Sequence, residues 1–263
     1  MATRNLEEAR RAYELGDIEA SRRAHSTPSP EKHKRGGEYI KSLVYGGMDG
    51  IITTFSIVAG ATGSELGTGV VIILGLSNVL ADGLSMAFGD YLSTKSEVEY
   101  RNAEKARETW EVENNPEGEM QEMEELYIAK GIPQEDAKLM VNALVKNKDA
   151  WINVMMVEEL GLLDGDESPV KNALVTFFSF IIMGIFPLIP FLIGHWVHGD
   201  IHILFYASIG LTALSLFFLG AAKTKFTSIH PIKSGIETLI VGGIAAGAAF
   251  LIGYVLEPLT NDD

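Results

Sequence analysis

The sequence predicts an all-α membrane protein with five transmembrane helices and an acidic, helical, cytosolic domain inserted between helices 2 and 3. Five long apolar stretches each approach the roughly 20 residues that an α-helix needs to cross a bilayer. Between the second and third stretches, residues 97–168 hold 19 Asp and Glu against 7 Lys and Arg, a net charge of −12 out of −14 for the chain. Lys and Arg also gather in alternate links between the stretches, as expected of a multi-pass protein.

This pattern divides the chain into five regions. The first region has mixed charge, lacks the apolar core of a signal peptide and allows a short amphipathic helix from Leu6 to Ala24. In order, the regions are a cytosolic N-terminal tail (1–38), transmembrane helices 1 and 2 (39–95), an acidic cytosolic helical domain (96–168), transmembrane helices 3 to 5 (169–257) and a C-terminal tail (258–263).

The five apolar stretches differ in their charge. The first contains Asp49 and the second Asp82, whereas the last three contain no charged residue. Pro187 and Pro190 should kink the third span or end its regular part. The predicted spans are Leu43–Ser64, Gly67–Gly89, Ala173–Ile193, Ile203–Ala222 and Thr238–Leu256.

The basic residues predict the topology, because Lys and Arg mark the cytosolic side of a membrane protein. The link between spans one and two and the link between spans three and four contain no Lys or Arg. The N-terminus and the acidic domain are therefore expected in the cytosol, and the C-terminus on the far side. The basic residues concerned are Lys32, Lys34, Arg35 and Lys41 before span one, and Lys223, Lys225 and Lys233 between spans four and five.

Helix breakers predict four helical stretches in the acidic domain. The second span meets no breaker until Asn114-Asn115-Pro116, so one long helix should leave the membrane and end near Glu113. Glycines that follow two later stretches have the position of helix caps. These later stretches are about Glu117–Lys130 before Gly131, Pro133–Val145, and Asp149–Leu160 before Gly161.

Paired ligands on these helices predict that the acidic domain binds divalent cations. The members of each pair are three or four residues apart and therefore share one face of a helix. Carboxylates suit hard cations, and a Met sulfur shifts the preference toward later metals such as Fe²⁺. A solvated acidic surface is the alternative interpretation of such a charge run. The pairs are Glu108 with Glu111, Glu119 with Glu122, and Met155 with Glu159.

Carboxylates within the spans predict a cation pathway. A charged Asp near the bilayer centre costs roughly 2.5–3.5 kcal/mol, so Asp49 and Asp82 should face a cavity or each other. Asn78, Asp82, Met86 and Asp90 follow one another at i+4 steps and form one stripe on span two. Amide, carboxylate and thioether groups on one stripe suit a borderline divalent cation. The alternative is a partly hydrated helix end in which Met86 only packs.

Several other functions are excluded by the residues present. The chain has no Cys, and therefore no disulfide, thiolate zinc site or iron–sulfur cluster. Ferritin-like di-iron sites need Glu-x-x-His, but residues 97–168 contain no His. The segment from Asp164 begins like an EF-hand loop but has Pro169 and Val175 where Gly and Glu are required. Nucleic acid is a poor partner for so acidic a segment, and no nucleotide-binding Gly loop or nucleophile–base pair suggests an enzyme.

Two further features leave alternatives open. His195, His198 and His202 lie in one short link with Asp200, where they suit either a metal on the far side or an ordinary membrane interface. Small residues at i and i+4 allow close helix contacts, either within one chain or between two copies. They occur as Gly46-x-x-x-Gly50 and Gly243-x-x-x-Gly247.

The motifs in the first two spans and in the acidic domain resemble those of the vacuolar iron transporter family. The resemblance covers residues 38–256 and implies a homodimer without a resident cofactor. It also implies exchange of cytosolic Fe²⁺, and related divalents such as Mn²⁺, Zn²⁺ and Co²⁺, for protons from an acidic compartment. The motifs are Tyr45-Gly-Gly-Met-Asp49-Gly-Ile-Ile-Thr-Thr-Phe, Ala81-Asp82-Gly-Leu-Ser-Met86-Ala-Phe-Gly-Asp90-Tyr-Leu-Ser and Met155-Met156-Val-Glu-Glu159-Leu-Gly.

The resemblance also implies roles for individual residues. Asp49 and Met86 would line the transport pathway. Plant-like members carry Glu where this chain has Asn78, which cannot titrate, and Asp82, one turn closer to the cytosol, is expected to substitute for it. The residues of the cytosolic metal-binding domain would be Glu108, Glu111, Glu119, Glu122, Met155, Met156 and Glu159.

Three functions are therefore considered. The first is a Fe²⁺/H⁺ antiporter, in a vacuole-like membrane of a eukaryote or the cell membrane of a prokaryote. The second is a passive divalent cation channel that uses the same residues without proton coupling. The third is a membrane-anchored metal buffer or sensor, in which the acidic domain matters and the intramembrane carboxylates do not.

Overall fold

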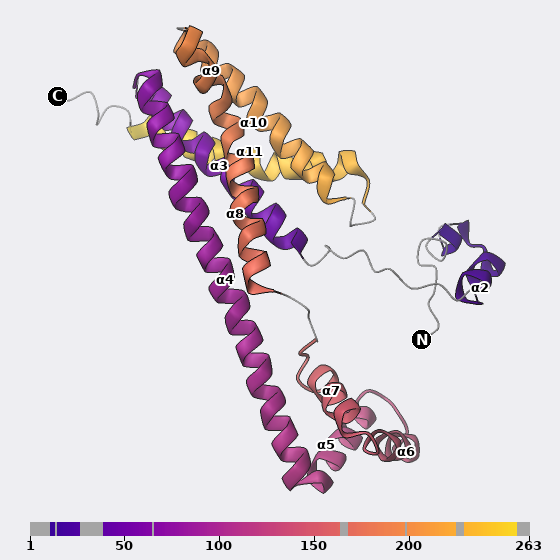
Figure 1. Cartoon of the computed structure of the whole chain (residues 1–263). Coiled ribbons are helices and arrows are strands. Elements are labelled where there is room, and N and C mark those ends of the chain that lie inside the picture. The colour runs from indigo at the N-terminus through magenta and orange to yellow at the C-terminus, as the bar shows by residue number, and fades with distance from the viewer. Residues whose placement is uncertain are drawn as a thin grey trace.

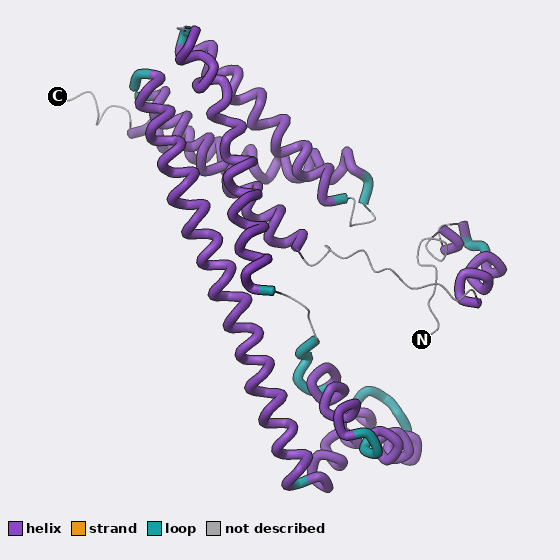
Figure 2. Tube along the Cα trace, viewed as in Figure 1, coloured by secondary structure: helices purple, strands orange, loops and turns teal. Residues whose placement is uncertain are grey.

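A computed structural model of the chain describes residues 11–13, 15–26, 39–64, 66–163, 168–197, 199–224 and 229–256. The described part is helical apart from short turns and loops (Figure 2). The predicted C-terminal tail, 258–263, and residues 164–167 of the segment that was excluded as an EF-hand loop lie outside the described residues, as does the start of the predicted amphipathic N-terminal helix.

The elements follow one another in a simple order (Figure 1). They are α2 (Ile18–Ser26), α3 (Ile40–Gly63), α4 (Thr68–Asn114), α5 (Pro116–Ala129), α6 (Gln134–Leu144), α7 (Lys148–Glu158), α8 (Pro169–Ile185), the 3₁₀ turn η2 (Phe186–Leu188), α9 (Ile189–Val197), α10 (Ile201–Lys223) and α11 (Pro231–Leu256).

Four helical segments of the described part are long and apolar enough to cross a membrane, so the chain is a multi-pass membrane protein. They are α3, α4, the continuous segment Pro169–Val197 and α10. Helix α11 coincides with the predicted fifth span.

Helix α4 connects the two parts of the molecule. Its 47 residues span about 70 Å, whereas the hydrocarbon core of a bilayer is only about 30 Å thick. One end of α4 packs with α3 and α8, and α5, α6 and α7 gather beside its other end (Figure 1). A helix of this length must extend well beyond the bilayer, and it carries the acidic segment with it.

The predicted ends of the helices in the acidic segment are confirmed. Helix α4 ends at Asn114, and Pro116 occupies the first turn of α5, where its missing N–H is not needed. Gly131 and Gly161 follow α5 and α7 with φ angles of 93° and 67°, which glycine adopts without a steric penalty. Helices α5 to α7 enclose an apolar core that includes Met123 and Trp151.

Glycines on α3 form the closest helix contact in the membrane part. A Cβ atom added to Gly46 would lie 2.7 Å from the carbonyl oxygen of Thr176 on α8, and one added to Gly50 would overlap the carbonyl oxygen of Phe180. By contrast, a Cβ atom at Gly243 or Gly247 on α11 would meet no atom of the described residues within 4 Å. The first small-residue motif therefore serves an internal contact, and the second is open.

Replacing Gly50 by Leu should destabilise the protein more than any surface change on the same helices. The side chain has no room against the α8 backbone, and overpacking typically costs about 1–3 kcal/mol even where side chains can move aside. Thermal unfolding of the purified protein in detergent, followed by loss of the monodisperse chromatographic peak, measures the effect. Gly60→Leu is the matched control, because an added Cβ atom at this position of the same helix meets no described atom within 4 Å, and an equal loss of stability in both variants would contradict the interpretation.

The prolines break the third span as predicted. Helix α8 passes into the 3₁₀ turn at Phe186 and continues as α9 from Ile189. Pro187 lacks a backbone N–H, and its carbonyl oxygen accepts a hydrogen bond of 2.7 Å from Ser208 Oγ on α10. The break is thereby fixed against a neighbouring helix.

Candidate metal centre

Five predicted glutamate ligands come together at the far end of α4. Glu108 and Glu111 lie on α4, Glu119 and Glu122 on α5, and Glu159 at the C-terminal end of α7. Carboxylate oxygens of Glu108, Glu111 and Glu119 all lie within 4.8 Å of one another. Oxygens bound to one divalent cation at about 2.0–2.6 Å are no more than about 5 Å apart, so these three can share an ion.

The cluster is buried to a degree that is unusual for glutamate. The Glu108 side chain is fully buried and that of Glu119 is 6% exposed. Glu108 Oε2 and one carboxylate oxygen of Glu159 are buried and accept no hydrogen bond within the described part of the chain, and Glu108 Oε1 there contacts only the Arg107 guanidinium, at 2.7 Å. Buried carboxylates that lack donors are costly, and a bound cation would supply the missing partner.

Burial and mutual repulsion raise the pKa values of the cluster. Loss of hydration raises the pKa of Glu108 to about 7, and the negative charge of Glu159 adds to the effect. Burial likewise raises the pKa values of Glu119 and Glu159, each with a contribution from the charge of Glu122. Protons are therefore held in the cluster near neutral pH, where they compete with cations.

Arg107 was not predicted as part of this site. Its guanidinium lies 3.0 Å from a Glu104 oxygen and 2.7 Å from oxygens of both Glu108 and Glu111. Arg107 is adjacent to a predicted ligand in sequence, but only the helix geometry shows that its side chain folds back over the carboxylates. The positive charge of the guanidinium partly neutralises the carboxylates that would attract a metal ion.

Replacing Arg107 by Gln should tighten the binding of divalent cations to the purified protein. The variant removes a positive charge that competes for Glu108 and Glu111, and we expect the Kd for Mn²⁺ to fall about tenfold, which corresponds to about 1.4 kcal/mol. Isothermal titration calorimetry measures the change. Lys105→Gln, two residues before Arg107 on the same helix and hydrogen-bonded to Asn153 instead, is the control, and weaker Mn²⁺ binding by Arg107→Gln would contradict the argument.

The two predicted sulfur ligands have a different environment. Met155 and Met156 are buried in the apolar core of α5 to α7, together with Val141 and Ile152. This packing accounts for both side chains without a metal ion. Their role as ligands therefore stays a prediction, although Glu159, at the end of the same helix, belongs to the glutamate cluster.

The predicted intramembrane residues lie on two neighbouring helices. Helices α3 and α4 form an antiparallel hairpin, and Asp49 on α3 is close enough to Asp82 on α4 for their charges to repel. Met86 lies one turn from Asp82, toward the acidic domain. Asn78 lies one turn on the other side, and its amide nitrogen is buried without a hydrogen bond within the described residues. The structure thus places all four predicted pathway residues on one helix pair.

The predicted histidine cluster is only partly described. His195 lies in the last turn of α9 and His202 in the first turn of α10, whereas His198 lies outside the described residues. Asp200 caps α10, because its carboxylate accepts hydrogen bonds from the backbone N–H groups of His202 and Ile203 at 2.9 and 3.3 Å. A helix cap explains Asp200 without a metal ion.

These features define the class of the protein. It is a multi-pass membrane protein in which acidic side chains gather both within the apolar helices and in a buried cluster beyond them. The sequence profile of the VIT family matches residues 40–254. The chain belongs to that family.

Relatives from distant organisms agree with this assignment. The chain is 41% identical to "Vacuolar iron transporter" from Toxoplasma gondii (strain ATCC 50861 / VEG), over 97% of this chain and 89% of the relative. It is 35% identical to "Vacuolar iron transporter" from Plasmodium falciparum (isolate 3D7), over 98% of each. It is 34% identical to "Vacuolar iron transporter 1" from Arabidopsis thaliana, over 86% of this chain and 90% of the relative. All three are named as transporters and not as enzymes, in agreement with the prediction that the chain has no catalytic function.

Proposed function

We propose that this protein transports divalent cations, Fe²⁺ first among them, out of the cytosol in exchange for protons. The glutamate cluster carries the proposal: three carboxylates from two helices lie within the reach of one ion, and two more lie beside them. The names of the relatives support iron as the cargo. Mn²⁺ and related divalents are included because carboxylate oxygens discriminate weakly among them.

In this mechanism, the acidic domain collects cations and the membrane helices carry them. A site with several negative charges raises the local cation concentration at the cytosolic face. Asp49 then binds the ion within the membrane, with Asp82, Met86 and Asn78 on the facing helix. Because a metal ion and protons compete for the same carboxylates, protons from the far side release the metal, and this competition provides coupling.

The proposal includes an arrangement in the membrane. Five helices cross it, α11 being the fifth, with the N-terminus and the acidic domain in the cytosol. The membrane is an intracellular, vacuole-like one in a eukaryotic source. Two copies associate, and the open Gly243 and Gly247 on α11 leave that helix available for a contact between them.

Flux into liposomes tests the proposal. The purified protein should drive uptake of Fe²⁺ when the lumen is more acidic than the bath, with protons leaving the lumen as metal enters. Parallel assays with Mn²⁺ and Zn²⁺ establish selectivity. Metal flux without proton movement would indicate a passive channel, and tight binding without flux would indicate a buffer or sensor.

Asn78 makes proton coupling through span two depend on Asp82. An amide cannot titrate, and Asp82 is the neighbouring carboxylate on the same stripe of α4. Proton-driven uptake that persists in Asp82→Asn would show that Asp82 does not substitute for the missing Glu.

A further inference from the structure

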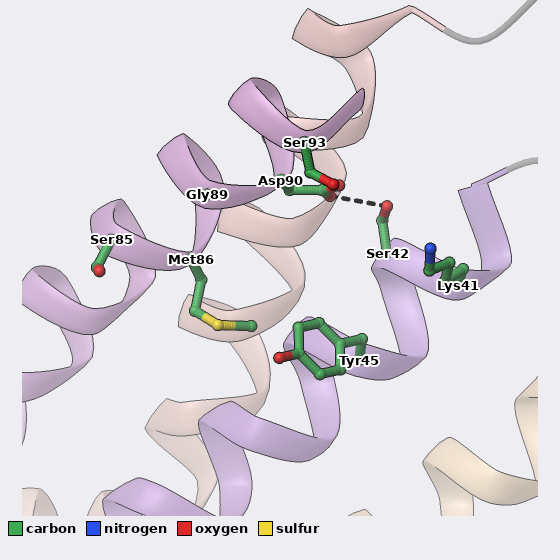
Figure 3. A pocket seen from close by; sticks show the side chains of 8 residues that line it. All are labelled: Lys41, Ser42, Tyr45, Ser85, Met86, Gly89, Asp90 and Ser93. Atoms are coloured by element: carbon green, nitrogen blue, oxygen red, sulfur yellow. Dashed lines mark hydrogen bonds between the residues drawn. The ribbon is translucent and has the colours of Figure 1, made fainter. Parts of the chain in front are cut away.

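A pocket between α3 and α4 lies on the side of Met86 that faces the acidic domain. Its volume is about 340 Å³, and both helices contribute polar side chains to it. Tyr45 and Ser42 line it from α3, and Met86 and Asp90 from α4 (Figure 3). The Met86 thioether is directed toward Tyr45, and the Asp90 carboxylate toward Ser42.

Asp90 is held at the pocket wall by hydroxyl groups from three helices. Ser42 Oγ on α3 donates a hydrogen bond of 2.9 Å to Asp90 Oδ2, and Thr176 Oγ1 on α8 donates to the same oxygen. Thr94 Oγ1, one turn along α4, makes a longer contact of 3.5 Å with Oδ1. Asn172 on α8 donates in turn to Thr94 at 3.1 Å. The three hydroxyl groups all donate to Asp90, and these bonds fix the orientation of its carboxyl group.

The charge of Asp90 has no counter-ion in this network. Every partner of its carboxylate is a neutral hydroxyl. Lys41 lines the same pocket, but it makes no ion pair with Asp90 in the described part of the chain. If the hydrogen bonds of Asp90 served only to hold the helices together, an uncharged amide or hydroxyl at this position would be sufficient. A carboxylate that is oriented but not neutralised has the properties of a cation ligand.

Along α4, the pocket lies between the intramembrane carboxylates and the glutamate cluster. On α4, Met86 and Asp82 lie four and eight residues before Asp90, and Asp82 is close enough to Asp49 on α3 for their charges to repel. On α3, Tyr45 and Asp49 are likewise four residues apart. A cation in the pocket would thus lie one helical turn from the next ligand on each helix.

We propose that this pocket is a further cation-binding station, in which the Asp90 carboxylate, assisted by the Met86 sulfur and the hydroxyls of Tyr45 and Ser42, takes a borderline divalent cation before it reaches Asp49. The proposal deepens the transport function proposed above and depends on it for direction. Oxygen and sulfur donors together favour ions such as Fe²⁺ over Mg²⁺ and Ca²⁺.

Protection of a single thiol tests the station without relying on transport. The chain contains no Cys, so a Ser93→Cys variant of the full-length protein carries one thiol at the pocket wall. Mn²⁺ at about ten times its Kd should slow maleimide labelling of that thiol about tenfold. Ser96→Cys, on an exposed position of α4 outside the pocket, is the control and should label equally fast with and without Mn²⁺.

Asp90 is then examined in the same background. Adding Asp90→Asn to Ser93→Cys should remove the protection, and Asp90→Glu should retain it; Asp90→Ser replaces the Asn variant if that variant does not fold. Protection that is absent from Ser93→Cys, or that survives the loss of the carboxylate, would overturn the proposal. Asp49→Asn should leave the protection intact, so a failure of the station and a failure of transport through Asp49 give different results.

Transport kinetics distinguish between two roles of Asp90, a cation ligand and a hydrogen-bonding residue that only connects helices. In liposomes, Asp90→Asn should raise the KM for Fe²⁺ about ten- to a hundredfold and change the saturating rate much less. Thr176→Val is the matched control, because it removes a hydrogen bond to Asp90 but keeps the charge. An unchanged KM in Asp90→Asn, or an equal rise in Thr176→Val, would show that Asp90 only connects helices.

Discussion

Replacing Asp49 by Asn should abolish proton-driven Fe²⁺ uptake into liposomes. Asp49 faces Asp82 across the α3–α4 hairpin, and two intramembrane carboxylates are costly unless cations or protons neutralise them. The amide removes both the charge that binds the ion and the group that exchanges it for a proton. We expect initial rates to fall by about a hundredfold or more, because a charged ligand within a low-dielectric site contributes several kcal/mol.

The same substitution should not harm the fold. Asn has nearly the shape of Asp, and its neutral amide relieves the repulsion with Asp82. Detergent-purified Asp49→Asn should therefore unfold at the same temperature as the parent protein or higher. Asp49→Glu, which keeps the carboxylate, is the control for charge. Uptake by Asp49→Asn at a rate close to that of the parent would contradict the proposed pathway.

Replacing Glu108 and Glu119 together by Gln should weaken the binding of Mn²⁺ to the acidic domain by about a hundredfold. These are the two most buried carboxylates of the cluster, and both come within 4.8 Å of Glu111. Losing two charged ligands from one site removes most of its affinity. Isothermal titration calorimetry of the full-length protein measures the change. Glu117→Gln, an exposed glutamate in the first turn of α5, is the matched control.

The pH dependence of binding gives this prediction a second readout. The pKa of Glu108 is raised to about 7, so protons should displace Mn²⁺ from the parent protein as the pH falls from 8 to 6. The Kd for Mn²⁺ should rise about tenfold per pH unit for each proton that is taken up. In the double variant this dependence should flatten. An unchanged pH profile, or an equal loss of affinity in Glu117→Gln, would contradict the assignment.

Metal-free protein should show the opposite dependence in its stability. The folded-state pKa of Glu108 lies above the value of 4.5 for an unperturbed Glu, so the folded state holds its proton more tightly than the unfolded state. The associated stability is present below about pH 4.5 and is lost as the pH rises through about 7. A divalent cation should restore it at neutral pH, which links folding of the acidic domain to metal occupancy.

The sequence by itself determined the class of the protein and the limits of its helices. Apolar length alone separates spans from soluble segments, since about 20 residues are needed to cross a bilayer. The breakers at Asn115-Pro116, Gly131 and Gly161 act locally, because proline lacks an N–H and glycine tolerates positive φ. The i, i+3 glutamate pairs on α4 and α5 could also be predicted, because residues three apart share one face of a helix whatever the tertiary structure.

Spacing could not decide which faces meet. Gly46 and Gly50 suited an internal contact or a contact between copies, and only the approach of the α8 backbone shows that they serve the internal one. Similarly, Met155 has the spacing of a ligand beside Glu159, but its neighbours in three dimensions are the apolar residues of the domain core.

Only the tertiary structure decided how the charges interact. It brings glutamates from α4, α5 and α7 into one cluster and folds the guanidinium of Arg107 over two of them. It also surrounds Asp90 with hydroxyls from three helices, the most distant of which is 86 residues from Asp90 in sequence. Burial and the mutual distances of charges set ligand strength and proton affinity, and both depend on helix packing, which a pattern along a single chain does not contain.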